Sequence, residues 1–109
     1  MLFTAMLFAA QAAAPILPPL NAMQQGALTC SAAFALDARV AGRDEAQLVR
    51  EREFFVRALA KIMDETGADR DTVAAMAGEE ARRLAGEPER LAQVLPACRS
   101  LVDTAATAR

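Results

Sequence analysis

The sequence predicts an all-α fold, a small antiparallel bundle of about four helices formed by residues 21–105 and tied by one disulfide. Apolar residues make up 54% of the 109 residues and aromatic residues only 5%, because alanine, the strongest helix former, supplies much of the apolar content. Apolar residues recur at helical spacing, and no stretch alternates apolar and polar residues as a strand does. A chain of this length makes a single domain.

The N-terminal third carries no charged residue before Asp37. Residues 2–10 form an apolar run of the length found in secretory signal peptides, and a bilayer span needs about 20 such residues. Ala10 and Ala12 place small residues at the −3 and −1 positions of a cleavage site. We therefore expect a signal peptide over residues 1–12 and export to the periplasm or beyond.

An alternative for this region stays open because no basic residue precedes the apolar run. Residues 2–14 could instead form a buried first helix, ended by the prolines that follow. These prolines lie in a Pro-rich segment over residues 13–20, and proline removes a backbone donor and restricts the residue before it.

Asn21 and Gln24 have the spacing of a capping box and predict a helix over residues 22–41, ended by Gly42. This helix is apolar nearly all round, which is typical of a helix surrounded by others. We expect it to be the central helix, with Gly26 and the many alanines allowing a neighbour to approach closely. The alternative is that one of its faces pairs with a partner chain.

The second helix has the clearest periodicity. Asp44 is suited to cap it, and an apolar stripe at helical spacing predicts a helix over residues 45–66, closed by Gly67. Its acidic residues, Glu51 and Glu53 among them, are expected at the helix start or on the polar face.

The third helix is predicted over residues 70–85, with Asp69 as N-cap and Gly86 after its end. Glu79 and Glu80 are adjacent and could suggest a pair of catalytic carboxylates. Neighbouring residues on a helix point about 100° apart, so we expect two surface charges that do not converge.

The fourth helix is predicted over residues 88–105. Pro88 takes the first helical position, which proline favours. Pro96 falls inside the apolar stripe, where it is expected to kink the helix or break it into two. Residues 106–109 are small and polar enough to fray.

The two cysteines, Cys30 and Cys98, lie far apart in the sequence and belong to no metal-binding motif. In an oxidising compartment such a pair predicts a structural disulfide between the first and last helices. Closing a loop of this length would stabilise the fold by about 4 kcal/mol on the chain-entropy model. The alternative is two buried free thiols in a cytosolic protein.

This layout resembles that of the acid-activated periplasmic chaperone family HdeA, small helical proteins with one disulfide between early and late helices. The matching residues are Cys30 with Phe34, in the pattern C-x-x-x-F, and Ala97 with Cys98. The separation of the cysteines is longer here than in that family. The resemblance is one of layout.

Four residues form a possible interaction surface. Arg52 falls within the apolar stripe of the second helix, where its stem can cover apolar surface while the guanidinium reaches water. Phe54 points nearly opposite to the stripe, and is either exposed, covered by the Pro-rich segment, or a contact for a partner. Leu28 and Leu36 point away from the main apolar face of the first helix.

The composition argues against an enzyme. The sequence has no His, Trp or Tyr, which excludes His-based acid–base catalysis, His-ligated metals and Ser-His-Asp triads. No Ser or Thr has an evident base, and no Gly-rich phosphate loop is present. Met23, Met63 and Met76 could bind Cu(I), but at helical spacing methionines are far more often core residues. We expect no catalytic residue, metal or cofactor.

Twelve basic and fourteen acidic residues leave a net charge of −2, so the sequence predicts no nucleic-acid partner. We expect a small exported, non-catalytic protein that acts as a binding or protein-interaction module and has no membrane span after signal cleavage. Its partner is another protein or a second copy of the chain. Two alternatives stay open, an acid-stress chaperone of the periplasm and a cytosolic helical protein with free thiols.

Overall fold

The computed structural model describes residues 19–107, so the expected signal peptide over residues 1–12 lies outside the described residues. The described part contains four α-helices and no strand: α1 (Ala22–Asp37), α2 (Glu45–Thr66), α3 (Arg70–Ala85) and α4 (Pro88–Thr107). The predicted all-α fold with four helices is confirmed.

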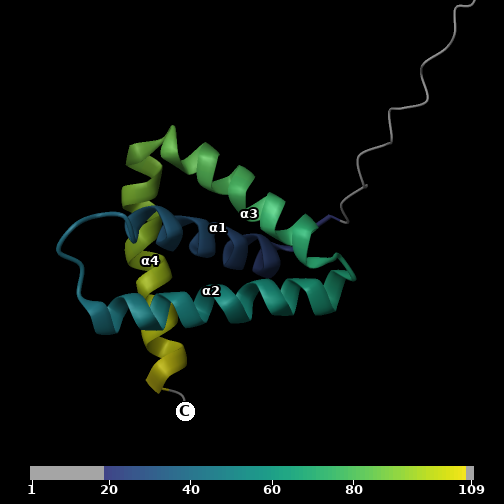
Figure 1. Cartoon of the computed structure of the whole chain (residues 1–109), viewed down its shortest axis with the longest axis horizontal. Coiled ribbons are helices and arrows are strands. Elements are labelled where there is room, and N and C mark those ends of the chain that lie inside the picture. The colour runs from purple at the N-terminus through teal and green to yellow at the C-terminus, as the bar shows by residue number, and fades with distance from the viewer. Residues whose placement is uncertain (1–18, 108–109) are drawn as a thin grey trace, which may run out of the picture.

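Helix α1, whose charged residue is Asp37 at its C-terminal end, lies at the centre of the molecule, between α2 and α3 (Figure 1). It packs against each of the other three helices. The directions of α1, α2 and α3 alternate in Figure 1, which is compatible with the predicted antiparallel packing, whereas α4 crosses α1 and α2 steeply.

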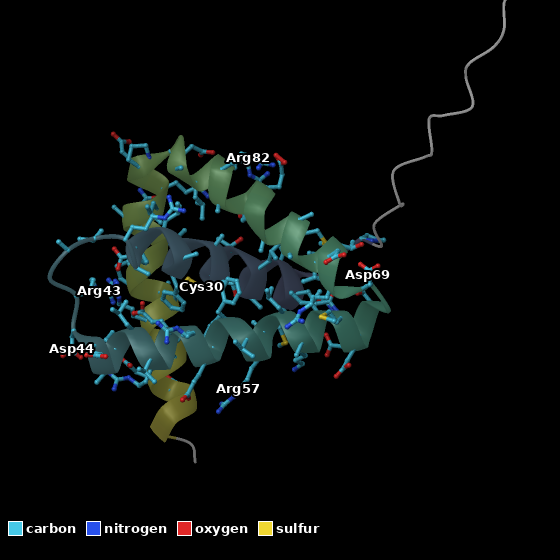
Figure 2. All side chains as sticks on the ribbon, in the orientation of Figure 1. Cys30, Arg43, Asp44, Arg57, Asp69 and Arg82 are labelled. Atoms are coloured by element: carbon cyan, nitrogen blue, oxygen red, sulfur yellow. A yellow bond between two sulfur atoms is a disulfide. The ribbon has the colours of Figure 1, made fainter. Side chains whose placement is uncertain are left out.

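The helix starts follow from local capping residues, as predicted. The Asn21 side chain accepts a hydrogen bond from the Gln24 amide (2.8 Å), and the Gln24 side chain accepts one from the Asn21 amide (3.0 Å). Asp44 and Asp69 cap α2 and α3 through the amides three residues later. Figure 2 shows these two aspartates beyond opposite ends of α2.

The predicted end of α1 at residue 41 is wrong, because the helix stops at Asp37. The Ala38 amide still bonds to the Phe34 carbonyl four residues back. The two amides after it bond to carbonyls three residues back, Arg39 to Leu36 and Val40 to Asp37. The Arg43 guanidinium binds both the carbonyl and the carboxylate of Asp37. Gly42 has a left-handed φ of 82°, but it lies in the loop rather than at the helix end.

Helix α4 is continuous through Pro96, so the predicted alternative of a break there is wrong. A proline within a helix leaves the carbonyl four residues earlier without its amide donor. Pro96 and Ala92 are both exposed, so water can take that place.

The core consists of three adjoining clusters of buried residues, and α1 contributes to each of them. The first joins α1, α2 and α3, the second joins α1 to α4, and the third joins α1 to α3. Their buried members are Leu28, Ile62, Val73 and Ala77; Cys30, Phe34, Cys98 and Val102; and Ala32, Ala33 and Leu84.

Candidate functional site

The predicted disulfide between Cys30 and Cys98 is confirmed, and it joins α1 to α4 with 5.4 Å between the two Cα atoms. Both cysteines are buried and pack with Phe34 and Val102. The bond is compatible with an oxidising compartment. Within the fold it holds α4 against the middle of α1.

A buried ion network surrounds Glu51 of α2, whose side chain is only 3% exposed. Arg43 donates from Nη2 to both carboxylate oxygens of Glu51, at 3.0 and 3.2 Å. Arg99 of α4 donates to the same carboxylate from Nε at 3.4 Å, and Gln47 does so at 3.0 Å. The expectation that Glu51 lies on the polar face is therefore wrong, because two cations from other segments pack over it.

The same two arginines, Arg43 and Arg99, both pair with the carboxylate of Asp37, at the end of α1. The network therefore links α1, the loop after it, α2 and α4. Burying a charge is tolerated when it is paired and hydrogen-bonded, which holds for each member here. These carboxylates are engaged in holding helices together.

A second buried carboxylate belongs to Glu80 of α3, which is 4% exposed. It accepts a hydrogen bond from the Thr29 hydroxyl of α1 (2.8 Å) and pairs with Arg83. The expectation of a surface charge is wrong for Glu80, because its side chain reaches the central helix, and it is right for the exposed Glu79. The two carboxylates do not form a pair.

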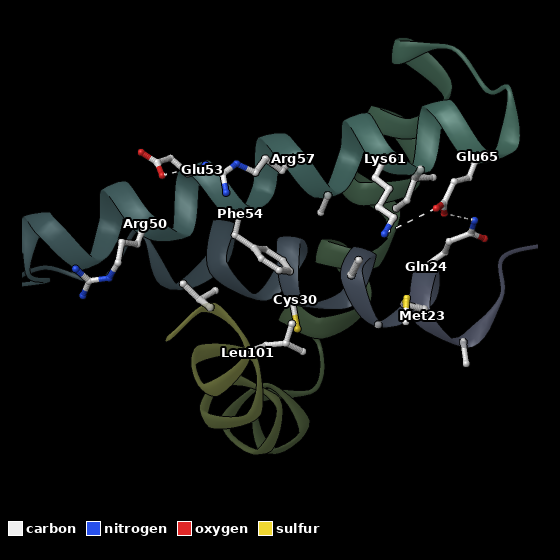
Figure 3. Close-up of a pocket in the computed structure, with 16 residues that line it drawn as sticks. Met23, Gln24, Cys30, Arg50, Glu53, Phe54, Arg57, Lys61, Glu65 and Leu101 are labelled. Carbon is white, nitrogen blue, oxygen red and sulfur yellow. Dashed lines mark hydrogen bonds and ion pairs between the residues drawn. The ribbon is translucent and has the colours of Figure 1, made fainter. Parts of the chain in front are cut away.

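A groove of about 610 Å³ lies between α1 and α2 and is closed on one side by α4. Its apolar floor combines half-buried and buried side chains from all three helices (Figure 3). They are Ala27, Cys30, Phe54, Ala58, Ile62 and Val102. The disulfide lies at this floor, so it fixes the third wall of the groove.

The charged rim of the groove belongs to α2. Arg50, Arg57 and Lys61 are spaced seven and four residues apart, which places them on one stripe of the helix. Two acids lie beside them: Glu53 is 3.8 Å from Arg57, and Glu65 is 3.9 Å from Lys61. These pairs are exposed and therefore weak, and the rim carries three cations against two anions.

The opposite side of the groove is uncharged. Met23 of α1 and Leu101 of α4 lie there, 76% and 54% exposed. Figure 3 places both across from the charged side chains of α2. A Cβ built at Gly26 would meet nothing within 4 Å. The expectation that Gly26 lets a neighbouring helix approach closely is therefore wrong, and the glycine instead leaves the groove open.

A second groove, of about 700 Å³, lies over α1 between α2 and α3. Its lining is also apolar, with Phe55, Val56 and Leu59 on the α2 side. Gly78 of α3 lines it, and a Cβ there would also meet nothing within 4 Å. One charged residue, Arg70, belongs to its lining among the described residues.

The four residues of the expected interaction surface lie in different places. Leu28 is 4% exposed and belongs to the core, so its assignment to a surface is wrong. Leu36 is half-buried against the α1–α3 cluster, and Arg52 is exposed and does not line either groove. Phe54 is half-buried in the floor of the first groove.

The charged rim of this groove was not predicted from the sequence, although the sequence contains part of its signal. The spacing of Arg50, Arg57 and Lys61 beside Phe54 could have shown a cationic stripe next to an apolar one. Nothing local indicates that α4 closes the groove.

The three methionines considered as copper ligands do not lie together. Met63 and Met76 pack against the α1–α2–α3 core, and Met23 lies at the groove. Among residues 19–107 no group of three or more His, Cys, Asp or Glu side chains could hold a metal ion. No helix in the same range is long and apolar enough to cross a bilayer.

Compared with known proteins, the chain matches no family model, no curated protein and no solved structure.

Proposed function

We propose that the protein is an exported, non-catalytic binding module that holds a partner in the groove between α1, α2 and α4. The groove itself is the observation that carries this proposal. Its floor is apolar, and Met23 and Leu101 stand exposed beside it. Exposed apolar side chains around a concave apolar surface are typical of binding sites.

The disulfide supports the exported part of the proposal, because such bonds persist in oxidising compartments. The buried carboxylates support a non-catalytic role. Glu51 and Glu80 are both held by arginines, and Asp37 is as well. None of the three lines the groove.

Binding in the groove is tested with N-phenyl-1-naphthylamine, a dye that fluoresces in apolar sites. Gly26→Leu places a side chain in the groove, whereas Gly78→Leu makes the same change in the other groove. The wild-type protein and Gly78→Leu should bind the dye, and Gly26→Leu should bind it at least about ten-fold more weakly. Equal binding by the two variants would refute a site in this groove.

Export is tested separately by expressing the full sequence in a Gram-negative host. Intact mass of the periplasmic fraction should show loss of residues 1–12. Cys30 and Cys98 should resist alkylation until they are reduced. A full-length cytosolic product with two alkylated thiols would instead favour the cytosolic alternative.

A second candidate function, an acid-stress chaperone, is favoured by the buried ion networks. Glu51 and Asp37 join three helices to one loop through their ion pairs with Arg43 and Arg99. Acidification should then expose apolar surface and raise the binding of a hydrophobic dye. No change down to pH 2 would exclude this function.

A further inference from the structure

We infer that the partner held in the groove is an amphipathic helix of another protein, with acidic residues along one edge of its apolar face. This inference rests on the function proposed above and adds the chemistry of the partner. Three features of the groove support it: its length, the small side chains of its α1 wall, and the distribution of its charges.

The groove is long. Its α2 wall extends from Arg50 to Glu65, which corresponds to about 22 Å at the rise of an α-helix. A partner helix of the same length has about four turns, enough for an apolar stripe to contact the whole floor. At one end the side-chain Nε2 of Gln24 in α1 donates to the Glu65 carboxylate of α2 (2.9 Å), so a polar contact bounds the apolar floor there.

Six residues of α1 line the groove, and four of them are small; the other two are Met23 and Gln24. Ala22, Gly26 and Ala27 are among the small ones, and the space beside Gly26 is open. Small residues let the backbone of a second helix approach closely. The large side chains that a partner helix would contact, Met23 and Leu101, lie at the edge of the groove, where they are exposed.

The charges point to an acidic partner. Both acids of the rim already lie near a rim cation, at 3.8 and 3.9 Å, whereas Arg50 donates to the neutral side chain of Gln47. The rim therefore has a cation in excess, and the wall across from it has no charge at all. A helix with acids on one edge and apolar residues elsewhere is complementary to both walls.

The distribution of the cations favours a helix over a single acyl chain. Arg50 and Lys61 are eleven residues apart, about 16 Å along α2, with Arg57 between them. A fatty acid has one carboxylate and could use one end of this row. A helix with an acid on successive turns can meet all three cations at once.

The test uses two designed peptides of 16 residues that share a leucine face. One carries glutamates along one edge of that face, and the matched peptide carries lysines at the same positions. Fluorescence anisotropy at low salt should show at least ten-fold tighter binding of the glutamate peptide. The difference should shrink as the salt concentration rises, because exposed charges are screened.

Two variants connect the binding to the groove. Arg57→Glu combined with Lys61→Glu should reverse the preference, so that the lysine peptide binds more tightly. Gly26→Leu should weaken the glutamate peptide at least ten-fold, and Gly78→Leu should leave it unchanged. Circular dichroism of each variant checks that the helices remain.

Failure of the inference is distinguishable from failure of the proposed function. If the naphthylamine dye binds in a Gly26-sensitive manner while neither peptide binds, the groove is a binding site and the helical partner is wrong. Equal affinity for the two peptides would also overturn the inference. Displacement of the dye by palmitate but by neither peptide would replace the helix with an acyl chain.

Discussion

Phe54 of α2 meets Phe34 of α1 edge to face, with 5.6 Å between the ring centroids and 87° between the ring planes. Phe34 belongs to the same buried cluster as the disulfide, and Phe54 packs against that cluster. The Phe54 ring thus packs against the core and also lines the groove. The pair connects the candidate binding surface to the most constrained part of the fold.

Truncating the two rings should therefore have unequal effects. Phe34→Ala removes a buried ring and should lower the free energy of unfolding by about 3–5 kcal/mol, whereas Phe54→Ala should cost less because it is half-buried. The double variant should reveal a coupling of about 0.5–1.5 kcal/mol, as expected for an edge-to-face pair. Urea denaturation of the four proteins measures it. A coupling near zero would show that the rings act independently.

Removing the buried carboxylate should destabilise the protein strongly. Glu51→Gln removes one counter-charge of Arg43 and Arg99, which both still pair with Asp37, and should cost at most about 3–5 kcal/mol, the range for broken buried ion pairs. Glu53→Gln is the matched control two residues away. It removes one exposed pair and should change stability by less than about 1 kcal/mol. Thermal denaturation measures both changes. Similar losses of stability in the two variants would mean that the buried ion network contributes little to the stability of the fold.

The helix starts could be predicted from the sequence because capping is local. Asn21, Asp44 and Asp69 each bond to an amide three residues later. The end of α1 could not be predicted in the same way. Asp37 there is bound by Arg99, which is 62 residues away in the sequence.

The same difference between local and distant contacts explains why the burial of Glu51 and Glu80 was not predicted. Glu51 and Glu80 look like ordinary surface acids in helical periodicity, because their partners Arg99 and Thr29 lie on other helices. The disulfide was predictable despite the separation of its cysteines, because the sequence has only two cysteines and an oxidising compartment favours their pairing. The groove depends on how α4 crosses α1, and the sequence contains no local signal for that crossing.

Substitution by alanine should have opposite effects on stability at two glycines, Gly26 and Gly67. Gly26 lies within α1 and has open space around it, so Gly26→Ala should stabilise the protein by about 0.8–1 kcal/mol through helix propensity. Gly67 also has open space, but its φ is 76°. Gly67→Ala should cost about 1–2 kcal/mol because a side chain disfavours this left-handed conformation. Thermal denaturation shifts of the same sign would contradict this account.

The cap of α3 should make stability depend on pH in the acid range. Hydrogen bonds from the side chain and the backbone amide of Thr72 lower the pKa of Asp69 below its ordinary 3.8. A carboxyl whose folded-state pKa is lowered adds stability above its unfolded-state pKa and loses it as the pH falls through the folded-state value.

Asp69→Asn keeps an acceptor at the cap but removes this titration. The wild-type protein should have the higher melting temperature at pH 7, and the difference should shrink as the pH falls below about 4. The exposed Asp64→Asn is the control, for which the difference should stay small at every pH. A constant difference between wild type and Asp69→Asn across this range would show that the ionised cap is not responsible.

Removing the disulfide should test how far the fold depends on it. Cys30→Ala with Cys98→Ala frees a 69-residue loop in the unfolded chain, which the chain-entropy model values at about 4 kcal/mol. A domain of this size has a total free energy of unfolding of about 5–10 kcal/mol, so the double variant should be only marginally folded at 37 °C. Reduction of the wild-type protein should produce a similar loss.

Because Cys98 holds α4 against α1 at the groove floor, dye binding should fall at temperatures where circular dichroism still shows folded helices. Loss of binding only together with helix unfolding would mean that the bond stabilises the whole domain without a separate effect on the groove.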